Sequence, residues 1–391
     1  MALATANAAT AATQQQAQGA LIPFPAASRR VRSGSTLSFT MTPGTAPVTL
    51  GPADLIPTGY IRAIEIHVST LTAGTLGPGV APADFPFNLF QNLQFIDAGG
   101  QKMDDLPGWA LLQDNVIGGF RAISDPRTDY DYSANPISPN FRLRLERELF
   151  PDGRGSLPNL SGTQKYRLRA VIDAIANIYS TAPTTAPTLK VEITQQEWFL
   201  PAAANGAGQA QQRQPPLMGL AQYRTSWYPA IAVSNAQINL QIKANGNLIK
   251  YIAFIGRNSS GVRTDLVFPD PFTLRVDNSY PWNSVPLANV IADSQSMFRQ
   301  ATARDTGMVI LPFDYGLGRG VGDNGYASWE ETSTATYITL QGVQPTPTVG
   351  TIDILVCEIS VAEIDPAERS ALGSATGTWN PNIAPTTMGG V

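Results

Sequence analysis

Strict alternation of apolar and polar residues is the feature that most limits what this chain can fold into. In Thr188–Leu200, "TLKVEITQQEWFL", every second residue from Leu189 to Ile193 is apolar and the residues between them are polar. Phe141–Glu146, "FRLRLE", alternates likewise until Arg147 falls where an apolar residue is due, which indicates a bulge or a strand end. A period of two is typical of strands with one wet face. The chain is therefore predicted to be mainly β, with antiparallel sheets.

A second series of strands follows a segment of different composition. Residues 203–216, "AANGAGQAQQRQPP", carry almost no charge and consist mainly of Ala, Gly, Gln and Pro, which is typical of a linker. Beyond it, a second β series starts at Ile238–Gly256, where Ile238, Leu240 and Ile242 alternate with polar residues and the Asn245-Gly246 pair is a two-residue hairpin signal. Further strands are predicted at "LVFPDPFTLRV", "GMVILPFDY", "TATYITLQG" and "GTIDILVCEISVAEI". The linker therefore separates two β domains.

Each half also contains one stretch with helical spacing. The first is Pro107–Gly118, and the second runs roughly from Val285 to Ala303, where Pro286 suits the first helical turn. Lys165–Tyr179 stays unassigned, because its first part alternates like a strand and its second part is rich in Ala and Ile. The halves share a layout but negligible sequence identity. We predict two tandem β-sandwich domains, each with a helix in one connection.

Composition bears on what covers the surface. The 391 residues are 43% hydrophobic, but only 14% are charged, against roughly 25% in an average soluble protein. Such a shortage of charge suggests that much of the surface faces other protein, although an uncharged extracellular β protein would look similar. The net charge of −4 argues against nucleic-acid binding. No apolar run approaches the roughly 18 residues that a membrane-spanning helix needs.

The N-terminal residues 1–34 are predicted to form an arm. They are neutral and rich in Ala, Thr and Gln until a small basic cluster at Arg29, Arg30 and Arg32, and they lack the pattern of a secretory signal. This composition permits a disordered tail. It equally suits an arm that becomes ordered against a neighbour or an anionic membrane, to which each arginine contributes about 1 kcal/mol of attraction.

The sequence offers little chemistry. His67 is the only histidine, which excludes metal sites built from several histidines, and any nucleophile–His–carboxylate triad would have to use His67 itself. Cys357, the single cysteine, lies in an apolar strand pattern and is expected to be buried. The glycine-rich Gly316–Gly325 lacks the Lys-Ser/Thr of a phosphate loop. Adjacent acids at Asp104-Asp105 and Glu330-Glu331 point to opposite faces of a strand. No catalytic, cofactor-binding or metal-binding residue and no enzymatic activity are therefore predicted.

Several segments together resemble a known family, the double jelly-roll major capsid proteins of tailless, membrane-containing phages of the tectivirus type. Similar segments in the first half are "FNLFQNLQFIDAGGQKMDDLPGWALL" with its Gly108-Trp109 pair, "KYRLRAVIDAIANI" and "KVEITQQEWFLP". In the second half they are "LIKYIAFIGRNSSG" and "FRQATARDTGMVILPFD". Residues 316–325 and the tail 365–391 lie outside the resemblance. The resemblance implies two eight-stranded jelly rolls, at 35–202 and 217–364.

The resemblance also implies an assembly. Three chains would form a homotrimer of pseudo-hexagonal outline that tiles an icosahedral virion shell around an internal membrane. Its partners would be neighbouring trimers, penton and minor capsid proteins and membrane lipid headgroups, with no direct contact to nucleic acid and no cofactor. The arm and the tail would act as clamps, and Arg29, Arg30 and Arg32 would contact lipid headgroups or a neighbouring capsomer.

A second function stays open at this stage. A carbohydrate-binding or carbohydrate-cleaving β-sandwich protein, such as a phage spike or receptor-binding component, would have the same strand pattern. The two carboxylates of a glycosidase can be far apart in the sequence, and sugar-binding modules often expose tryptophan rings. Of the six tryptophans, Trp109 and Trp198 lie in apolar company and are predicted to be core residues.

Overall fold

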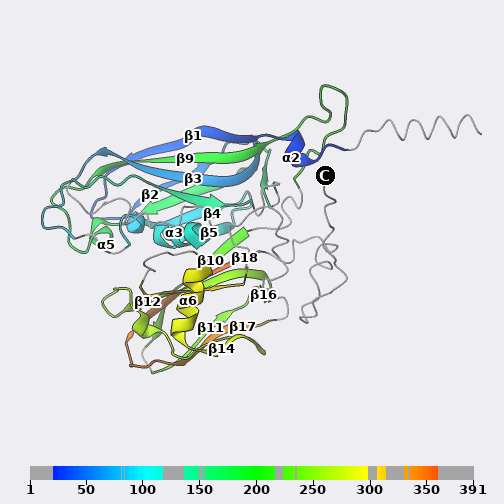
Figure 1. Cartoon of the computed structure of the whole chain (residues 1–391). Helices are drawn as coiled ribbons and strands as arrows, with labels where there is room; N and C mark the ends of the chain where they lie inside the picture. The colour runs from blue at the N-terminus through cyan, green and yellow to red at the C-terminus, as the bar shows by residue number, and fades with distance from the viewer. Residues whose placement is uncertain are drawn as a thin grey trace, which may run out of the picture.

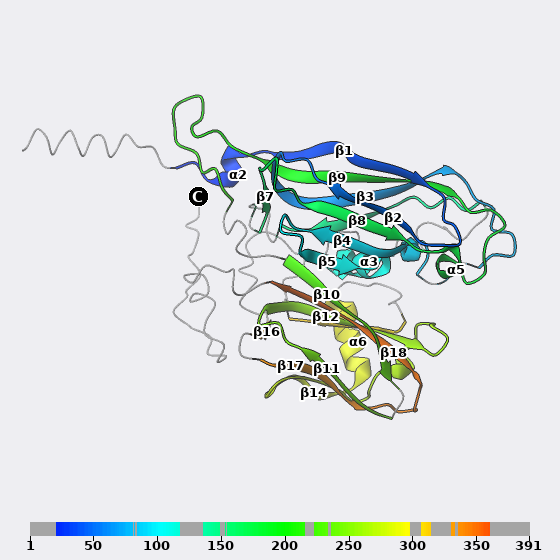
Figure 2. The ribbon, with the colours of Figure 1, turned by 180° about the vertical axis from the view of Figure 1, so that it is seen from behind.

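The computed structural model describes residues 21–80, 82, 84–117, 136–148, 153, 155–215, 223–233, 236–297, 306–313, 330–332 and 335–359. Within these residues the chain forms two β-sandwich domains that lie against each other, each made of two antiparallel sheets (Figures 1 and 2). The predicted fold class is confirmed. The loop 316–325, the tail 365–391 and the first part of the predicted arm lie outside the described residues.

The first domain has a jelly-roll order of strands. Its β1 sheet runs in the order β1 (Arg30–Met41), β9 (Thr188–Phe199), β3 (Gly59–Thr72) and β6 (Phe141–Glu146), and the short β7 (Leu157–Asn159) also pairs with β3. Its β2 sheet runs in the order β2 (Val48–Asp54), β8 (Arg167–Ile172), β4 (Phe90–Ile96) and β5 (Lys102–Leu106). The last strand therefore lies between the first and the third, as two nested Greek keys require.

The second domain repeats this order strand for strand. Its β10 sheet runs in the order β10 (Tyr223–Val233), β18 (Gly350–Ile359), β12 (Leu248–Asn258) and β15 (Met308–Pro312), and the short β16 (Glu330–Glu331) also pairs with β12. Its β11 sheet runs in the order β11 (Gln237–Lys243), β17 (Tyr337–Val343), β13 (Phe272–Val276) and β14 (Ser279–Val285). In the described residues each domain thus has the eight predicted strands and one short additional strand.

The two predicted helical connections are present at the same place in each domain, between the strand pairs β5–β6 and β14–β15. They are α3 (Gly108–Ile117) and α6 (Leu287–Met297), while residues 298–305 lie outside the described residues. The described residues also form two shorter helices, α2 (Phe24–Ala27) and α5 (Ile175–Ile178), and two 3-10 turns, η1 (Phe87–Leu89) and η2 (Asp265–Val267). None of the described helices is long and apolar enough to span a bilayer.

The structure resolves two ambiguous segments and overturns one expectation. Lys165–Tyr179 is a strand followed by a short helix, β8 and α5, and the β6 strand ends at Glu146, one residue before the anomalous Arg147. The hairpin predicted at Asn245-Gly246 is wrong. Although this turn joins β11 to β12, the two strands belong to different sheets and do not pair with each other. Turn chemistry fixes the local reversal of the chain but not the strand that becomes its neighbour.

Three strands of the β10 sheet, β12, β15 and β18, are largely buried on both faces. On β12, Ile252 and Phe254 face the core of the second domain. Tyr251, Ala253 and Ile255 alternate with them and belong to a cluster made mostly by the first domain. Strands covered on both faces need apolar residues at successive positions, which explains the mainly apolar runs in "LIKYIAFIG", "GMVILP" and "TIDILVC", where Lys250 and Asp353 are the charged exceptions.

The N-terminal residues that the structure describes are part of the first domain. Phe24 is fully buried and meets the rings of Tyr60 and Trp198 edge-on, with centroids 5.5 and 5.6 Å apart. Ile22 pairs with Gln211 of the predicted linker. The first strand starts at Arg30, within the segment 1–34 that was expected as an arm. The remaining domain boundaries stay a prediction.

Candidate assembly surfaces

The contact between the two domains is built around α3. This helix is buried at nearly every position because it packs on β6 of its own domain and lies next to the β10 sheet of the second (Figure 1). The Trp109 ring meets Trp227 of β10 edge-on, with centroids 6.2 Å apart, and the Arg257 guanidinium lies 5.0 Å from the centroid of Trp109. Trp109 is therefore a half-buried junction residue, whereas Trp198 is a core residue as predicted.

A polar group lies at the centre of this apolar junction. Asp114 of α3 is buried, and its carboxylate accepts a hydrogen bond of 2.9 Å from the Thr225 hydroxyl and another from the Tyr251 hydroxyl. Burial, and secondly the negative charge of Asp114, raises the pKa of Tyr251 well above its usual value, so the phenol stays a donor. This constellation fixes how the two domains face each other, because an unpaired buried carboxylate is costly.

Ion pairs close the edge of the junction. The Asp84 carboxylate of the first domain forms ion pairs with two guanidinium groups of the second domain, that of Arg263 at 2.5 Å and that of Arg257 at 2.9 Å. Arg257 also contacts Asp353 of β18, at 3.4 Å. With most of these side chains largely withdrawn from water, separating the domains would leave several charges without partners, so the two jelly rolls behave as one unit.

The outer face of the β1 sheet is polar and exposed, in contrast to the β10 sheet. Glu65 at its centre is paired with Arg32 at 2.6 Å and with Arg142 at 3.4 Å. Beside it, His67 contacts Asn140 at 2.9 Å and lies 3.8 Å from Glu192. His67 is thus a partly exposed residue among these charged side chains. In the described residues, α2 covers one end of the face, where Phe24 packs on Tyr60 and Trp198.

The predicted basic cluster lies at the start of the β1 sheet. The guanidinium of Arg29 lies 5.0 Å from the centroid of Phe199, and that of Arg30 lies 4.9 Å from the centroid of Trp198. Arg32 differs because it points along the outer face to Glu65. The structure therefore brings Arg29 and Arg30 to one end of the sheet and sets Arg32 apart. Contacts of the three arginines with lipid or with another capsomer stay a prediction.

In the described part of the chain, no group of three His, Cys, Asp or Glu side chains could hold a metal ion. Cys357 is buried in β18, as its apolar strand pattern predicted. Asp104 and Asp105 point to opposite faces of β5, the former to the buried Arg147 and the latter to Lys102 at 2.7 Å. The side chains of Glu330-Glu331 lie outside those described.

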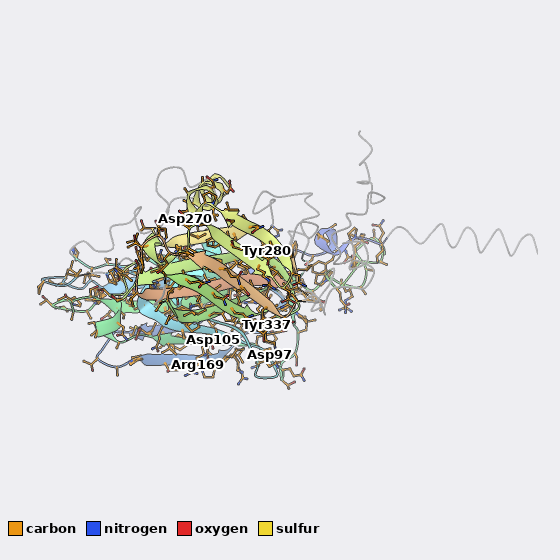
Figure 3. All side chains as sticks on the ribbon, turned by 90° about the horizontal axis from the view of Figure 1, so that it is seen from below. Asp97, Asp105, Arg169, Asp270, Tyr280 and Tyr337 are labelled. Atoms are coloured by element: carbon orange, nitrogen blue, oxygen red, sulfur yellow. The ribbon has the colours of Figure 1, made fainter. Side chains whose placement is uncertain are left out.

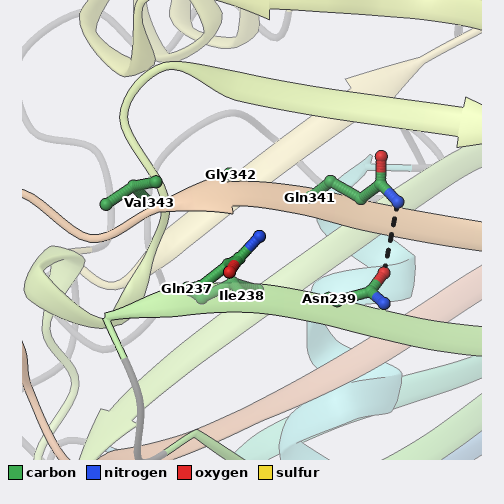
Figure 4. A pocket seen from close by; sticks show the side chains of 6 residues that line it. All are labelled: Gln237, Ile238, Asn239, Gln341, Gly342 and Val343. Carbon is green, nitrogen blue, oxygen red and sulfur yellow. Dashed lines mark hydrogen bonds between the residues drawn. The ribbon is translucent and has the colours of Figure 1, made fainter.

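The second domain's β11 sheet presents an open surface with one shallow hollow. The hollow lies between β11 and β17, and Gln341 donates to Asn239 across it at 3.2 Å (Figure 4). Two tyrosines of the same sheet, Tyr280 and Tyr337, are 49% and 44% exposed (Figure 3). The hollow is lined by amide and small apolar side chains without a carboxylate, so it lacks the acid pair of a glycosidase.

Three buried carboxylates at or near the ends of β6 and β9 were not anticipated. Glu148 accepts from the Trp198 indole at 2.8 Å and pairs with Arg62 at 2.5 Å. Burial raises the pKa of Glu146 to about 7, against the opposing effect of Arg144, and burial likewise raises the pKa of Glu197 to about 7. A signal for Glu197 existed in the sequence, because it continues the face of β9 that begins with apolar residues.

The fold of this chain is similar to solved structures of viral capsid proteins. No protein-family model and no curated protein matches the chain. The structure of the major capsid protein (MCP) of STIV superposes with a TM-score of 0.54 at 14% identity, covering 88% of this chain and 99% of that chain. A chain from the atomic structure of Sulfolobus Turreted Icosahedral Virus superposes with a TM-score of 0.55 at 16% identity, covering 88% of this chain and 96% of that chain.

These matches extend over nearly the full length of the viral chains, so they include both jelly rolls. At such low identity they establish the arrangement of strands and not the activity. In the described residues, the second domain of this chain repeats the sheet order of the first, β10-β18-β12-β15 against β1-β9-β3-β6, and has its helical connection at the same place. The chain has the double jelly-roll fold of viral major capsid proteins.

Proposed function

We propose that the chain is the major capsid subunit of an icosahedral virus, a structural protein without enzymatic activity. In this proposal three copies form a homotrimer of six jelly rolls with a pseudo-hexagonal outline, and trimers tile a shell around an internal membrane. Neighbouring trimers, penton proteins and minor capsid proteins are its partners. Nucleic acid is not contacted directly.

One observation carries this proposal: two equivalent jelly rolls are joined head to tail by a buried junction. The helix side of the first domain lies on the outer sheet face of the second, so the contact is heterologous, and heterologous contacts generate rings when the rotation closes. The match over 99% of the length of the STIV MCP supports the same use of the fold. The low content of charged residues, 14%, agrees with a surface that is largely covered by other subunits.

The native mass of the purified full chain tests the proposal. Light scattering at two concentrations tenfold apart should give the mass of three chains at both, because a capsid building block must persist on dilution. Particles assembled from it should contain the trimer as their repeating unit when imaged. A monomer at both concentrations would contradict the proposal and return attention to a carbohydrate-binding function.

The basic end of the β1 sheet is proposed to face the membrane. Arg29 and Arg30 are exposed beyond their aromatic contacts, and each arginine near an anionic surface contributes about 1 kcal/mol. Replacing both with serine in the full chain should therefore weaken binding to phosphatidylserine vesicles about 30-fold at low salt, measured by co-sedimentation. Lys165→Ser, in the loop before β8, is the control that should change little. Equal binding of the double variant and the parent would remove the membrane role.

A further inference from the structure

The two helical connections can be aligned residue by residue. Pro107 and Pro286 precede α3 and α6, and the carbonyl of each accepts hydrogen bonds from the backbone N–H groups three and four residues later. With the prolines superposed, the buried Leu111 corresponds to the buried Val290. On the same alignment Asp114, the acid at the centre of the junction, corresponds to Asp293.

The environments of these two acids differ completely. Asp114 is buried against the β10 sheet, whereas Asp293 is exposed. The exposed side of α6 also carries Ala288 and Ala292, at the positions of Trp109 and Gln113 in α3. Thus α6 packs on β15 as α3 packs on β6, but among the described residues its outward side, which carries Ala288, Ala292 and Asp293, is exposed and not packed on a second sheet.

The sheets that would receive these helices are equivalent as well. In the β10 sheet, Thr225, Cys357 and Tyr251 face each other across β10, β18 and β12, directly after an irregularity in β12. In the β1 sheet, the row directly after the matching irregularity in β3 is Arg32, Gln196 and Ala63, across β1, β9 and β3. The two rows also meet the last residues of β15 and β6 in the same way.

Equivalence of the rows places a basic residue where the acid of α6 needs a partner. Arg32 occupies the position of Thr225, the residue whose hydroxyl donates to Asp114. The side chain of Arg32 is 51% exposed, on a face that the described part of the chain covers at its α2 end. The rest of the receiving face is polar where the β10 sheet is apolar. On the aligned registers Glu65 replaces Ala253 and His67 replaces Ile255.

We propose that α6 of one copy of the chain docks on the outer face of the β1 sheet of a second copy, with Asp293 accepting hydrogen bonds from Arg32 of that copy. This contact repeats between chains the junction that α3 makes within the chain. It rests on the proposed capsid function and specifies the surface that closes the trimer. The apolar junction within a chain is permanent, while the polar one joins subunits that have already folded.

A charge exchange in the full chain tests this contact. Asp293→Arg alone should weaken association about tenfold or more, since it sets like charges opposite each other, and Arg32→Asp alone should do the same. The double variant should recover most of the association. Asp54→Arg, an exposed acid of the β2 sheet, is the matched control and should leave the mass unchanged. Sedimentation equilibrium gives the association constants, and circular dichroism verifies that each variant is folded.

The outcomes separate the contact from the capsid function. A parent chain that is monomeric would overturn the proposed function and this contact with it. A trimeric parent whose mass is insensitive to Asp293→Arg would overturn the contact and leave the function standing. Dissociation of each single variant without recovery in the double variant would show that Asp293 and Arg32 do not meet.

Discussion

Replacing Arg147 with methionine should lower the free energy of unfolding by about 3–5 kcal/mol, the usual cost of removing one partner from a buried ion pair. Arg147 and its partner Asp104 are only 2% and 4% exposed, and the guanidinium lies 4.8 Å from the centroid of Phe95. Methionine keeps much of the volume but leaves the Asp104 charge without a cation. Urea unfolding of the variant and the parent at the same protein concentration measures the difference.

Two further variants identify the cause of that loss. Adding Asp104→Leu to Arg147→Met removes the stranded charge, so the double variant should recover most of the lost stability. Lys102→Met breaks the pair with Asp105 on the same strand, where the lysine is 51% exposed, and should cost less than about 1 kcal/mol. If Arg147→Met were as mild as Lys102→Met, the buried pair would not stabilise the first domain.

Arg147 also shows which structural features the sequence alone can predict. Alternation predicts the β6 strand and shows that Arg147 breaks the pattern, and the structure ends the strand at that point. What the pattern could not supply is the partner, because Asp104 lies on another strand, separated by a helix. Alternation reports which side of a strand is buried, whereas contacts across the core depend on how the strands are ordered.

The junction between the domains was missed for a different reason. Unbroken apolar runs in β12, β15 and β18 differ from the alternating β9 and β11, and this difference indicates strands covered on both faces. From the sequence, these runs are predicted as strands, and burial is expected only for Cys357. Identification of the covering element requires the position of α3, whose weakly amphipathic sequence fits burial on several sides.

The wrong hairpin prediction at Asn245-Gly246 and the equivalence of α3 and α6 both follow from the order of strands in a jelly roll. In a jelly roll, consecutive strands often belong to opposite sheets, so a tight turn does not imply a hairpin. The order is instead set by which pairs bury the most apolar surface. That order recurs in both halves although their sequences do not, and only the structure makes Asp114 and Asp293 equivalent.

Replacing Glu197 with glutamine should stabilise the protein by roughly 2 kcal/mol more at pH 8 than at pH 5. Glu197 is 2% exposed, and its neighbours Thr58, Asn159 and Gln195 are neutral donors, with Gln195 at 2.9 Å and Asn159 at 3.3 Å. Burial raises the pKa of this carboxyl from 4.5 to about 7 in the folded chain, although the hydrogen bonds act in the opposite direction.

The sign follows from proton binding. Between pH 4.5 and about 7 the folded state holds the Glu197 proton more tightly than the unfolded state, so the free energy of unfolding decreases as the pH rises through this range. Glutamine is neutral throughout and keeps the acceptor for Gln195 and Asn159, so its advantage over glutamate should grow from pH 5 to pH 8. Urea unfolding at both pH values measures it.

Glu192→Gln, on the opposite face of the same strand, separates this effect from a general loss of negative charge. Its side chain is 25% exposed and accepts from Lys190 at 2.7 Å, and this bond holds the pKa of Glu192 below its usual value. Glutamine there should not gain stability with rising pH. If Glu197→Gln behaved like Glu192→Gln, the Glu197 carboxylate would ionise normally in the folded protein. A pH-dependent gain confined to Glu197 would instead show that β9 carries a protonated carboxyl in its buried face near neutral pH.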